Sequence, residues 1–316
     1  GIGRGTGMKL LLKNERHLIE RWKNALHNRV PGLEVVTFPF VGDPAEIDVA
    51  LVWEPPQGLL ASMENLRMVI STGAGVDHIL RDPSYPRDVP LVRMVDPGLT
   101  QGMIEYVVMA TLLCTRRMHR TFAHQANRVW QEEEVRLATD HKVGIMGIGV
   151  LGQACASALI GMGYNVMGWS RSPKQLDGVE TYHGIDGLEK FLNRSEVLIC
   201  LLPLTPDTEG ILGRGTFNRL PQGAAVINAG RGGHMVEEDL LAALDRGRVE
   251  VAVLDVFREE PLPTEHPLWD HPRVFVTPHV AAVTAPETAI FAVADAIDEL
   301  RRGLPLSNLV SMDQGY

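Results

Sequence analysis

The chain has 316 residues, 45% of them hydrophobic and 22% charged, and its 39 acidic against 30 basic residues give a formal net charge of −9. This length predicts two domains, and the ordinary globular composition excludes a disordered, collagen-like or disulfide-stapled chain. No apolar run reaches the about 20 residues that span a bilayer, and the acidic balance disfavours nucleic acid or an anionic membrane as a partner. The three cysteines, Cys114, Cys155 and Cys200, lie in apolar segments. They predict reduced thiols in a cytoplasmic protein.

The first part of the chain alternates short apolar runs with amphipathic stretches. We interpret the glycine-rich residues 1–7, which precede Met8, as an artificial extension ahead of the native start. Their glycines do not predict a nucleotide loop, because no strand pattern precedes them. Predicted strands then cover residues 9–13, 33–39, 48–53, 66–71 and 90–95, with helices near residues 15–27 and 58–64. Since parallel strands need crossover connections, this alternation predicts a parallel sheet.

Residues 100–128 form a long, mostly apolar stretch with a basic tail. We predict a single long helix that links the two domains. The tail carries His119 and His124, which we expect at the surface because nothing around them has the spacing of metal ligands.

From His141 the alternation restarts more strongly. Six strands are predicted at residues 142–147, 165–170, 196–202, 224–229, 250–256 and 273–277, and a last helix runs from Pro286 to about Arg302. Six strands with intervening helices are typical of the two mononucleotide-binding halves of a doubly wound sheet. The predicted fold class is therefore α/β, with doubly wound parallel sheets.

A glycine pattern at residues 147–152 is the first chemical signal. Gly147, Gly149 and Gly152 follow an apolar strand and open a helix, which is the context that a dinucleotide-binding loop requires. The first glycine permits a tight turn, the second lets the backbone approach a pyrophosphate, and the third lets helix and strand pack closely. The helix N-terminus, which begins near Val150 and Leu151, supplies amide donors.

The end of the second strand indicates which dinucleotide binds. Proteins that select NAD place an acid about 20 residues beyond the glycines, where it holds the ribose hydroxyls. This chain instead has Ser170, Arg171 and Ser172. Hydroxyls and a guanidinium are suited to a 2′-phosphate, so we expect NADPH to be preferred over NADH.

Three further residues follow three predicted strands. Arg231, Glu260 and His279 each lie just past a strand end, where doubly wound sheets bind their ligands. The set is suited to reducing a 2-oxo acid, because the alkoxide left by hydride transfer needs a proton and histidine titrates near neutral pH. A carboxylate would orient the imidazole, and an arginine would bind the substrate carboxylate and polarise the carbonyl.

These motifs resemble the D-isomer-specific 2-hydroxyacid dehydrogenases, and the resemblance covers nearly the whole chain. It includes residues 71–78 (STGAGVDH), the glycine loop, residues 202–208 (LPLTPDT) and the three segments just described. Residues 53–56 (WEPP) and 169–172 (WSRS) look most like the NADPH-dependent glyoxylate/hydroxypyruvate reductases of the bacterial A type.

The resemblance implies a role for individual residues. His279 would be the proton donor, Glu260 rather than Glu259 its partner, and Arg231 the residue that orients the 2-oxo acid. Residues implied in cofactor binding are Gly147, Gly149, Val150, Leu151, Gly152, Ser170, Arg171, Ser172, Leu202, Pro203, Thr208, Ala229, Gly230 and Asp255, the last at the nicotinamide amide. Residues implied in substrate binding are Trp53, Gly73, Ala74, Gly75, Val76, Arg231 and Trp130.

The resemblance also implies a layout. A flavodoxin-like, discontinuous substrate-binding domain would comprise residues 8–100 and 285–316, and residues 101–284 would form the Rossmann domain, with the active-site cleft between the two. Members usually form homodimers through their cofactor domains. Trp130 would then either reach the partner's active site or anchor the interface, and Trp53 would either border the substrate pocket or pack in the core.

Several alternatives stay open at this point. The substrate could be a bulkier 2-oxo acid such as phenylpyruvate, or the protein could bind a nicotinamide cofactor as a sensor on the same fold. The three adjacent acids at residues 132–134 match no family pattern and are typical of a solvated surface, although at a pocket mouth they would repel anionic substrates. We expect no metal, because His266, His271 and His279 lack ligand spacing.

Overall fold

The computed structural model describes residues 7–316. Residues 1–6, which make up most of the predicted extension, lie outside the described part of the chain. The chain divides into two compact units. The described residues up to Leu99 together with Val283–Tyr316 form the first unit, and Thr100–Ala282 form the second. Each unit is described by itself below.

The first unit is built on a five-stranded parallel sheet. Its strands are β1 (Met8–Lys13), β2 (Leu33–Thr37), β3 (Val49–Val52), β4 (Met68–Ser71) and β5 (Leu91–Val92). They are arranged in the order β2-β1-β3-β4-β5, the 2-1-3-4-5 order of flavodoxin-like folds. All residues of β3 and β4 are buried, as expected for a parallel sheet whose two faces are both covered.

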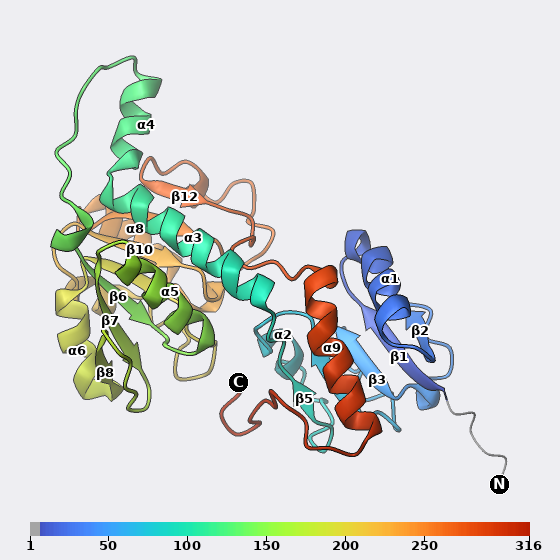
Figure 1. The fold of residues 1–316 in the computed structure, drawn as a ribbon. Helices are drawn as coiled ribbons and strands as arrows, with labels where there is room; N and C mark the ends of the chain where they lie inside the picture. Colours follow the sequence, from blue (N-terminus) through green and yellow to red (C-terminus); the bar gives the residue numbers. More distant parts are fainter. Residues whose placement is uncertain (1–6) are drawn as a thin grey trace, which may run out of the picture. The chain divides into compact units, whose positions relative to one another are not determined.

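Two helices far apart in the sequence cover one face of this sheet. Figure 1 shows α1 (Ile19–Arg29) beside α9 (Pro286–Arg301), which brings the C-terminal segment onto the N-terminal sheet. Arg21 of α1 forms a bidentate ion pair with Glu287 of α9, with N–O distances of 2.8 and 2.6 Å. The smaller helical elements of the unit are η1 (Arg16–Leu18), η2 (Pro44–Glu46) and α2 (Asp77–Leu80).

The helix predicted near residues 58–64 is wrong, because this segment forms successive turns. Gly58, with a φ of +84°, has a left-handed backbone that an α-helix does not use. Its N–H donates to the carboxylate of Asp82 at 2.8 Å, which fixes the segment as a loop.

The second unit contains a seven-stranded parallel sheet. Its strands are β6 (Lys142–Met146), β7 (Asn165–Ser170), β8 (Glu180–His183), β9 (Val197–Cys200), β10 (Ala224–Asn228), β11 (Val249–Leu254) and β12 (Val274–Val276). Their order is β12-β11-β10-β9-β6-β7-β8, so the direction of winding reverses between β6 and β9. The prediction of six strands missed β8, a short edge strand of mixed polarity whose four residues are all at least partly exposed.

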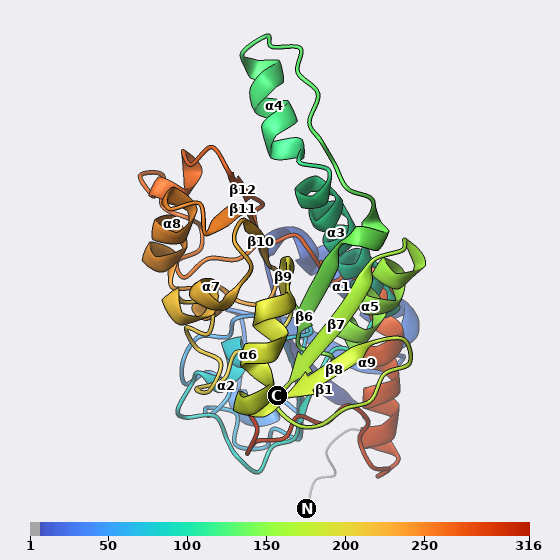
Figure 2. The same ribbon diagram turned by 90° about the vertical axis from the view of Figure 1, so that its left-hand side faces the viewer.

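Helices cover both faces of this second sheet. The buried side chains of α6 (Gly184–Arg194), α7 (Arg214–Arg219) and α8 (Glu237–Asp245) pack in one core, and those of α3 (Pro97–Thr115) and α5 (Val150–Gly161) pack in the other (Figure 2). The unit also contains the short 3-10 helices η3 (Ala138–Asp140), η4 (Gly232–His234) and η5 (Pro267–Trp269). Within the part of the chain that the structure describes, no helix is both long enough and apolar enough to cross a membrane.

The prediction of a single long helix at residues 100–128 is wrong, because the structure has two separate helices in this segment. α3 ends at Thr115, and α4 (Met118–Ala126) begins after Arg117, whose left-handed φ of +54° redirects the chain. Figures 1 and 2 both show α4 and the segment that returns from it projecting away from the rest of their unit. We call residues 117–137 the arm.

Candidate active site

The glycine loop connects β6 to α5, at the point where the strand order reverses. Gly147 has a φ of +98°, and a Cβ there would lie 2.8 Å from the backbone of Leu201. A Cβ on Gly152 would lie 1.9 Å from the carbonyl oxygen of Gly147, so the protein's own backbone requires both glycines. Gly149 differs, since a Cβ there would meet nothing within 4 Å. It leaves open space directly before the first residue of α5, where helix amides can receive a pyrophosphate.

The segment after β7 carries the residues predicted to select the dinucleotide. Ser170 is buried, and its hydroxyl donates to the carbonyl oxygen of Ser172 at 2.6 Å, so it shapes the turn. Arg171 is about half exposed, with its guanidinium 3.3 Å from the carboxylate of Asp207. Because an exposed ion pair is weak, a phosphate could displace Asp207.

Lys174 is a cation near the glycine loop that sequence reasoning missed. Its Nζ atom lies 3.4 Å from the carbonyl oxygen of Ile148, which lies between the first two glycines. The available signal was a second basic residue three positions after Arg171, on the same connection.

Thr208 stabilises the segment that follows β9. Its hydroxyl donates to the carbonyl oxygen of Pro203 at 2.7 Å and accepts from the N–H of Thr205 at 2.9 Å. Leu202 and Thr208 are both buried. The structure thus gives Thr208 a role in holding Pro203, and its predicted place in the cofactor channel stays a prediction.

Arg231, Glu260 and His279 follow β10, β11 and β12, respectively. These three strands are neighbours in the sheet and run parallel, so the three residues lie at the same end of the sheet, just past the carboxyl ends of the strands. Ligands bind at this end of open α/β sheets.

The structure brings Glu260 to His279. Oε2 of Glu260 lies 2.7 Å from Nδ1 of His279, while Oε1 accepts the N–H of Phe257 at 3.0 Å. An ionised carboxylate can only accept hydrogen bonds, so Nδ1 carries a proton directed at Glu260. The other proton of a charged imidazole is then on Nε2. Of the two adjacent acids, Glu260 rather than Glu259 is therefore the partner, as predicted.

The pair shifts the protonation of both side chains. The hydrogen bond to Glu260 raises the pKa of His279 above its ordinary value, against burial, which lowers it. Burial alone would raise the pKa of Glu260. The hydrogen bonds from His279 and from the backbone of Phe257 outweigh burial, so the pKa lies below its ordinary value. The positive charge of nearby Arg231 lowers both pKa values. A charged imidazole beside an anionic carboxylate is thus stabilised near neutral pH.

Asp255 holds the loop that presents His279. Its carboxylate accepts the Thr277 hydroxyl at 2.7 Å and the backbone N–H groups of Val280 and Ala281 at 2.8 and 3.0 Å. These bonds surround His279, which has a left-handed φ of +54°. Asp255 is only 1% exposed. Its predicted contact with a nicotinamide amide stays a prediction, and what the structure shows is a role in positioning the histidine.

His234 is a second residue that sequence reasoning missed. Its fully buried ring accepts the backbone N–H of Arg231 on Nδ1 at 3.0 Å, and Nε2 lies 3.2 Å from the carbonyl oxygen of Pro203. It therefore joins the segment of Arg231 to the segment after β9. A Cβ on Gly230 would lie 2.8 Å from Nδ1 of His234, which explains why this position requires glycine. Arg231 itself donates from Nη1 to the carbonyl oxygen of Gly230 at 2.9 Å.

The predicted substrate residues of the first unit lie together. A Cβ on Gly73 would lie 2.7 Å from the ring of Trp53, so the indole packs directly against this turn. Trp53, Gly73, Ala74 and Gly75 are partly exposed, while Val76 is buried immediately before α2. Trp53 is thus only partly buried, and its predicted place at the substrate pocket stays a prediction.

The arm carries the run of three acids. Only its outer members, Glu132 and Glu134, are exposed. The side chain of Glu133 is 11% exposed and lies 2.9 Å from His124 and 3.8 Å from both Arg117 and Arg120. The expectation of a solvated run is therefore wrong for Glu133, which fastens the returning segment to α4.

His119, also on the arm, is buried rather than at the surface as predicted. Its Nε2 atom lies 3.1 Å from the carboxylate of Glu250 in β11. The contact ties the base of the arm to the sheet.

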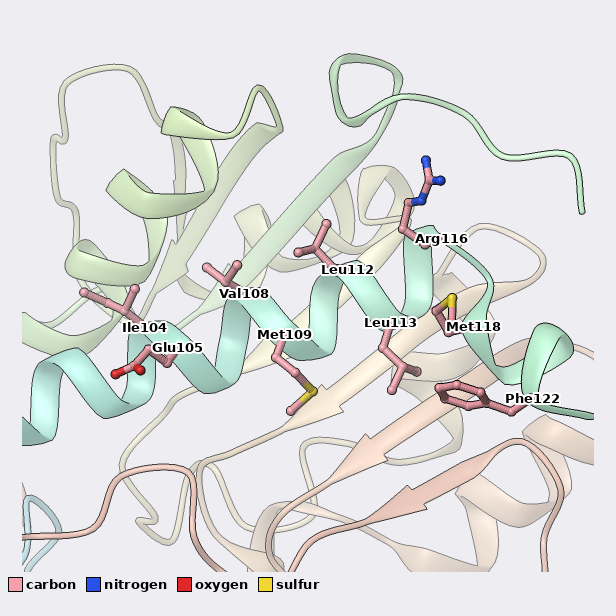
Figure 3. Close-up of a pocket in the computed structure, with 9 residues that line it drawn as sticks. All are labelled: Ile104, Glu105, Val108, Met109, Leu112, Leu113, Arg116, Met118 and Phe122. Atoms are coloured by element: carbon pink, nitrogen blue, oxygen red, sulfur yellow. The ribbon is translucent and has the colours of Figure 1, made fainter. Parts of the chain in front are cut away.

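A shallow apolar groove of about 630 Å³ runs between α3 and α4 (Figure 3). Its lining residues are Ile104, Glu105, Val108, Met109, Leu112, Leu113, Arg116, Met118 and Phe122. Beyond it on the arm, Trp130 is 98% exposed. Across residues 7–316, no group of three or more histidine, cysteine, aspartate or glutamate side chains could hold a metal ion.

The chain is similar to known proteins over most of its length. Residues 108–281 match the family model described as "D-isomer specific 2-hydroxyacid dehydrogenase, NAD binding domain". A protein of Yersinia enterocolitica named glyoxylate/hydroxypyruvate reductase A is 44% identical over 94% of this chain and 96% of its own length.

Two solved structures are similar over the whole fold. A D-isomer-specific 2-hydroxyacid dehydrogenase of Xanthobacter autotrophicus, in complex with NADPH and MES, has a TM-score of 0.94 at 39% identity, covering 98% of this chain and 100% of its own. An NADPH-dependent glyoxylate/hydroxypyruvate reductase of Sinorhizobium meliloti, in complex with NADP and sulfate, has a TM-score of 0.92 at 42% identity with the same coverage. The chain belongs to the family of D-isomer-specific 2-hydroxyacid dehydrogenases.

Proposed function

We propose that the protein is an NADPH-dependent reductase of small 2-oxo acids, which converts glyoxylate to glycolate and hydroxypyruvate to D-glycerate. The observation that carries the proposal is the 2.7 Å contact between His279 and Glu260, at the sheet edge that also presents Arg231. The printed names of the Yersinia and Sinorhizobium relatives support the choice of substrates.

The cofactor proposal rests on the glycine loop and the segment after β7. When bound, NADPH supplies the hydride. The open space at Gly149 and the N-terminus of α5 would receive the pyrophosphate, and Arg171 and Lys174 would pair with the 2′-phosphate. NADPH and NADP in the Xanthobacter and Sinorhizobium structures support this preference over NADH.

Arg231 binds and orients the substrate in this proposal. Its guanidinium can form two parallel hydrogen bonds with an oxo acid and polarise the carbonyl, so negative charge developing on oxygen is stabilised. The backbone amides of residues 73–76 receive the substrate carboxylate. The first unit would accordingly serve as the substrate-binding domain and the second as the dinucleotide-binding domain.

His279 supplies the proton. The imidazolium donates its Nε2 proton to the oxygen of the carbonyl that has received the hydride. It then becomes neutral and keeps its Nδ1 proton, which stays hydrogen-bonded to the Glu260 carboxylate. Glu260 makes the charged imidazole available at neutral pH. The backbone hydrogen bonds that Asp255 accepts from Val280 and Ala281 fix the direction in which His279 points.

The groove between α3 and α4 supports a homodimer formed through the second units. Met109 and Phe122 expose apolar side chains there, and Trp130 is almost fully exposed on the same arm. A second copy of this chain would cover these surfaces. The three buried cysteines are unpaired, which is consistent with a reducing, cytoplasmic location.

Product analysis tests the proposed reaction. The protein would be incubated with NADPH and hydroxypyruvate, and the glycerate formed would be resolved into its enantiomers. The proposal expects D-glycerate, with an equivalent amount of NADP. Formation of L-glycerate, or consumption of NADPH without glycerate, would contradict it.

A further inference from the structure

A buried pair of polar side chains lies beneath the substrate segments of the first unit. Ser71 ends β4 with no exposed surface, and His78 is the second residue of the short helix α2, with 4% of its surface exposed. Buried polar groups are costly unless they are hydrogen-bonded, so their partners indicate what they do.

His78 holds two separate backbone segments. Its Nδ1 atom accepts the N–H of Glu54 at 2.9 Å. Its Nε2 atom lies 3.0 Å from Oγ of Ser71 and 3.1 Å from the carbonyl oxygen of Gly75. Because Nδ1 is the acceptor, the ring proton is on Nε2 and the imidazole is neutral. One ring thus joins the segment after β3 to the turn after β4.

Ser71 completes the connection within the turn. Its hydroxyl lies 2.9 Å from the carbonyl oxygen of Gly73 and 3.0 Å from that of Gly75, and it accepts the N–H of Gly73 at 3.2 Å. Together the two side chains contact the backbone on both sides of Ala74. The conformation of residues 73–75 is therefore fixed by side chains from beneath.

The contact with Glu54 has a specific consequence. Glu54 has a left-handed φ of +46°, a conformation that is unfavourable for a residue with a Cβ. The hydrogen bond from its N–H to His78 stabilises this conformation. Trp53, the preceding residue, packs its ring on the imidazole with a centroid distance of 4.2 Å and an angle of 44°. The same indole contacts the turn at Gly73.

We infer that His78, supported by Ser71, is the positioning residue that sets the spacing between the indole of Trp53 and the backbone amides of residues 73–76. Resting on the proposed function, this gives His78 control of substrate size. The amides receive the carboxylate common to all 2-oxo acids, and the indole limits the side chain that fits beside it. His78 touches neither substrate nor cofactor and acts through these two segments.

Two substitutions separate the contacts of His78. His78→Asn keeps an acceptor near the position of Nδ1, whereas His78→Leu removes all three polar contacts and keeps the bulk of the side chain. We expect His78→Leu to raise the KM for glyoxylate about 10-fold or more. This is the loss of affinity that usually follows when a buried polar group loses one hydrogen bond. The ratio of kcat/KM for phenylpyruvate over glyoxylate should rise, while the KM for NADPH stays unchanged. His78→Asn should restore most of the affinity for glyoxylate.

The matched control is His27→Leu, which changes an exposed histidine on α1 of the same unit and should leave every parameter unchanged. If His78→Leu does not fold, Ser71→Ala removes one hydroxyl and should still raise the KM for glyoxylate several-fold. An unchanged KM in either folded variant would overturn the inference. So would equal losses for glyoxylate and NADPH, which are expected from general destabilisation.

Binding of oxamate separates this inference from the proposed reaction. Oxamate has the carboxylate and carbonyl of a 2-oxo acid, and its affinity for the NADP-loaded protein is measured by calorimetry. If wild type reduces no 2-oxo acid but binds oxamate, the proposed function fails, and a weakening of about 10-fold in His78→Leu still supports the inference. Unchanged oxamate affinity in that variant, or no binding by wild type, would overturn it.

Discussion

The imidazole of His279 and the carboxylate of Glu260 lie 2.7 Å apart, although 19 positions separate them in the sequence. The contact exists because β11 and β12 are neighbouring parallel strands whose following loops leave the sheet at the same edge. Asp255, at the end of β11, binds the loop after β12 and fixes the histidine in it. Removing either member of the pair therefore has distinct, measurable consequences.

Replacing His279 with alanine removes the proton donor. We expect kcat for glyoxylate to fall about 10²- to 10⁴-fold, the usual contribution of general acid catalysis, with NADPH affinity within about twofold of wild type. Steady-state kinetics and a fluorescence titration with NADPH measure the two effects. His183→Ala, which changes an exposed histidine of the same unit, is the control. Near-normal turnover of His279→Ala would exclude it as the donor.

Replacing Glu260 with glutamine changes the pH dependence. Reduction needs the charged form of His279, whose raised pKa keeps this form populated to higher pH. Loss of the carboxylate lowers that pKa, so the alkaline fall of kcat/KM should move about one pH unit or more to lower pH. Glu259→Gln should leave the profile where it is. A profile of Glu260→Gln that coincides with wild type, or moves to higher pH, would contradict the assignment.

Replacing Arg171 with alanine tests the dinucleotide preference. We expect the Kd for NADPH to rise about 10- to 100-fold, as for a lost bond to a charged group, and that for NADH to stay constant. Asp207→Asn removes the carboxylate that pairs with Arg171 and should leave NADPH binding as tight as in wild type or tighter. Equal losses for both cofactors in Arg171→Ala would show that it does not bind the 2′-phosphate.

Gly149, the N-cap of α5, and Gly161, the last residue of the same helix, allow a test of the cofactor site with an internal control. A Cβ at either position would meet nothing within 4 Å, so alanine should be tolerated in the fold at both. Only Gly149 faces the proposed pyrophosphate site. Gly149→Ala should keep the Tm within about 2 °C of wild type and weaken NADPH about 10-fold or more, and Gly161→Ala should change neither. Normal NADPH binding by Gly149→Ala would remove the loop from the cofactor site.

The proposed homodimer is tested at the groove. Met109→Glu and Phe122→Glu place a charge on its exposed apolar residues and should convert the dimer to monomers in sedimentation velocity. Ile185→Glu, at an apolar residue of α6 that is 89% exposed, should leave the dimer intact. A monomeric wild type, or dimers unaffected by the groove substitutions, would place the interface elsewhere.

The placement of Arg231, Glu260, His279 and the glycine loop could be predicted because each follows an apolar strand, and parallel strands bring their following loops to the same end of the sheet. Local signals were insufficient elsewhere. Nothing in the apolar pattern around Arg117 marks its left-handed backbone, so α3 and α4 were expected to be one helix. The edge strand β8 has too little apolar character to be recognised.

The positioning residues could not be predicted for a different reason. Asp255, His234 and His78 act through hydrogen bonds to backbone groups of other segments, which no residue spacing reveals. Glu133 was grouped with its acidic neighbours, and only the fold of the arm brings Arg117, Arg120 and His124 to its carboxylate. In each case the partner is set by tertiary structure.

The proposed reduction is measured most directly by following the absorbance of NADPH and NADH with glyoxylate, hydroxypyruvate, pyruvate and phenylpyruvate in parallel. We expect rapid oxidation of NADPH with glyoxylate and hydroxypyruvate, and slower oxidation of NADH. Oxidation of the cofactor with phenylpyruvate alone would be consistent with the proposed mechanism but would contradict the proposed substrates. Cofactor binding without oxidation by any of the four acids would contradict a reductase and point to a nicotinamide-sensing protein.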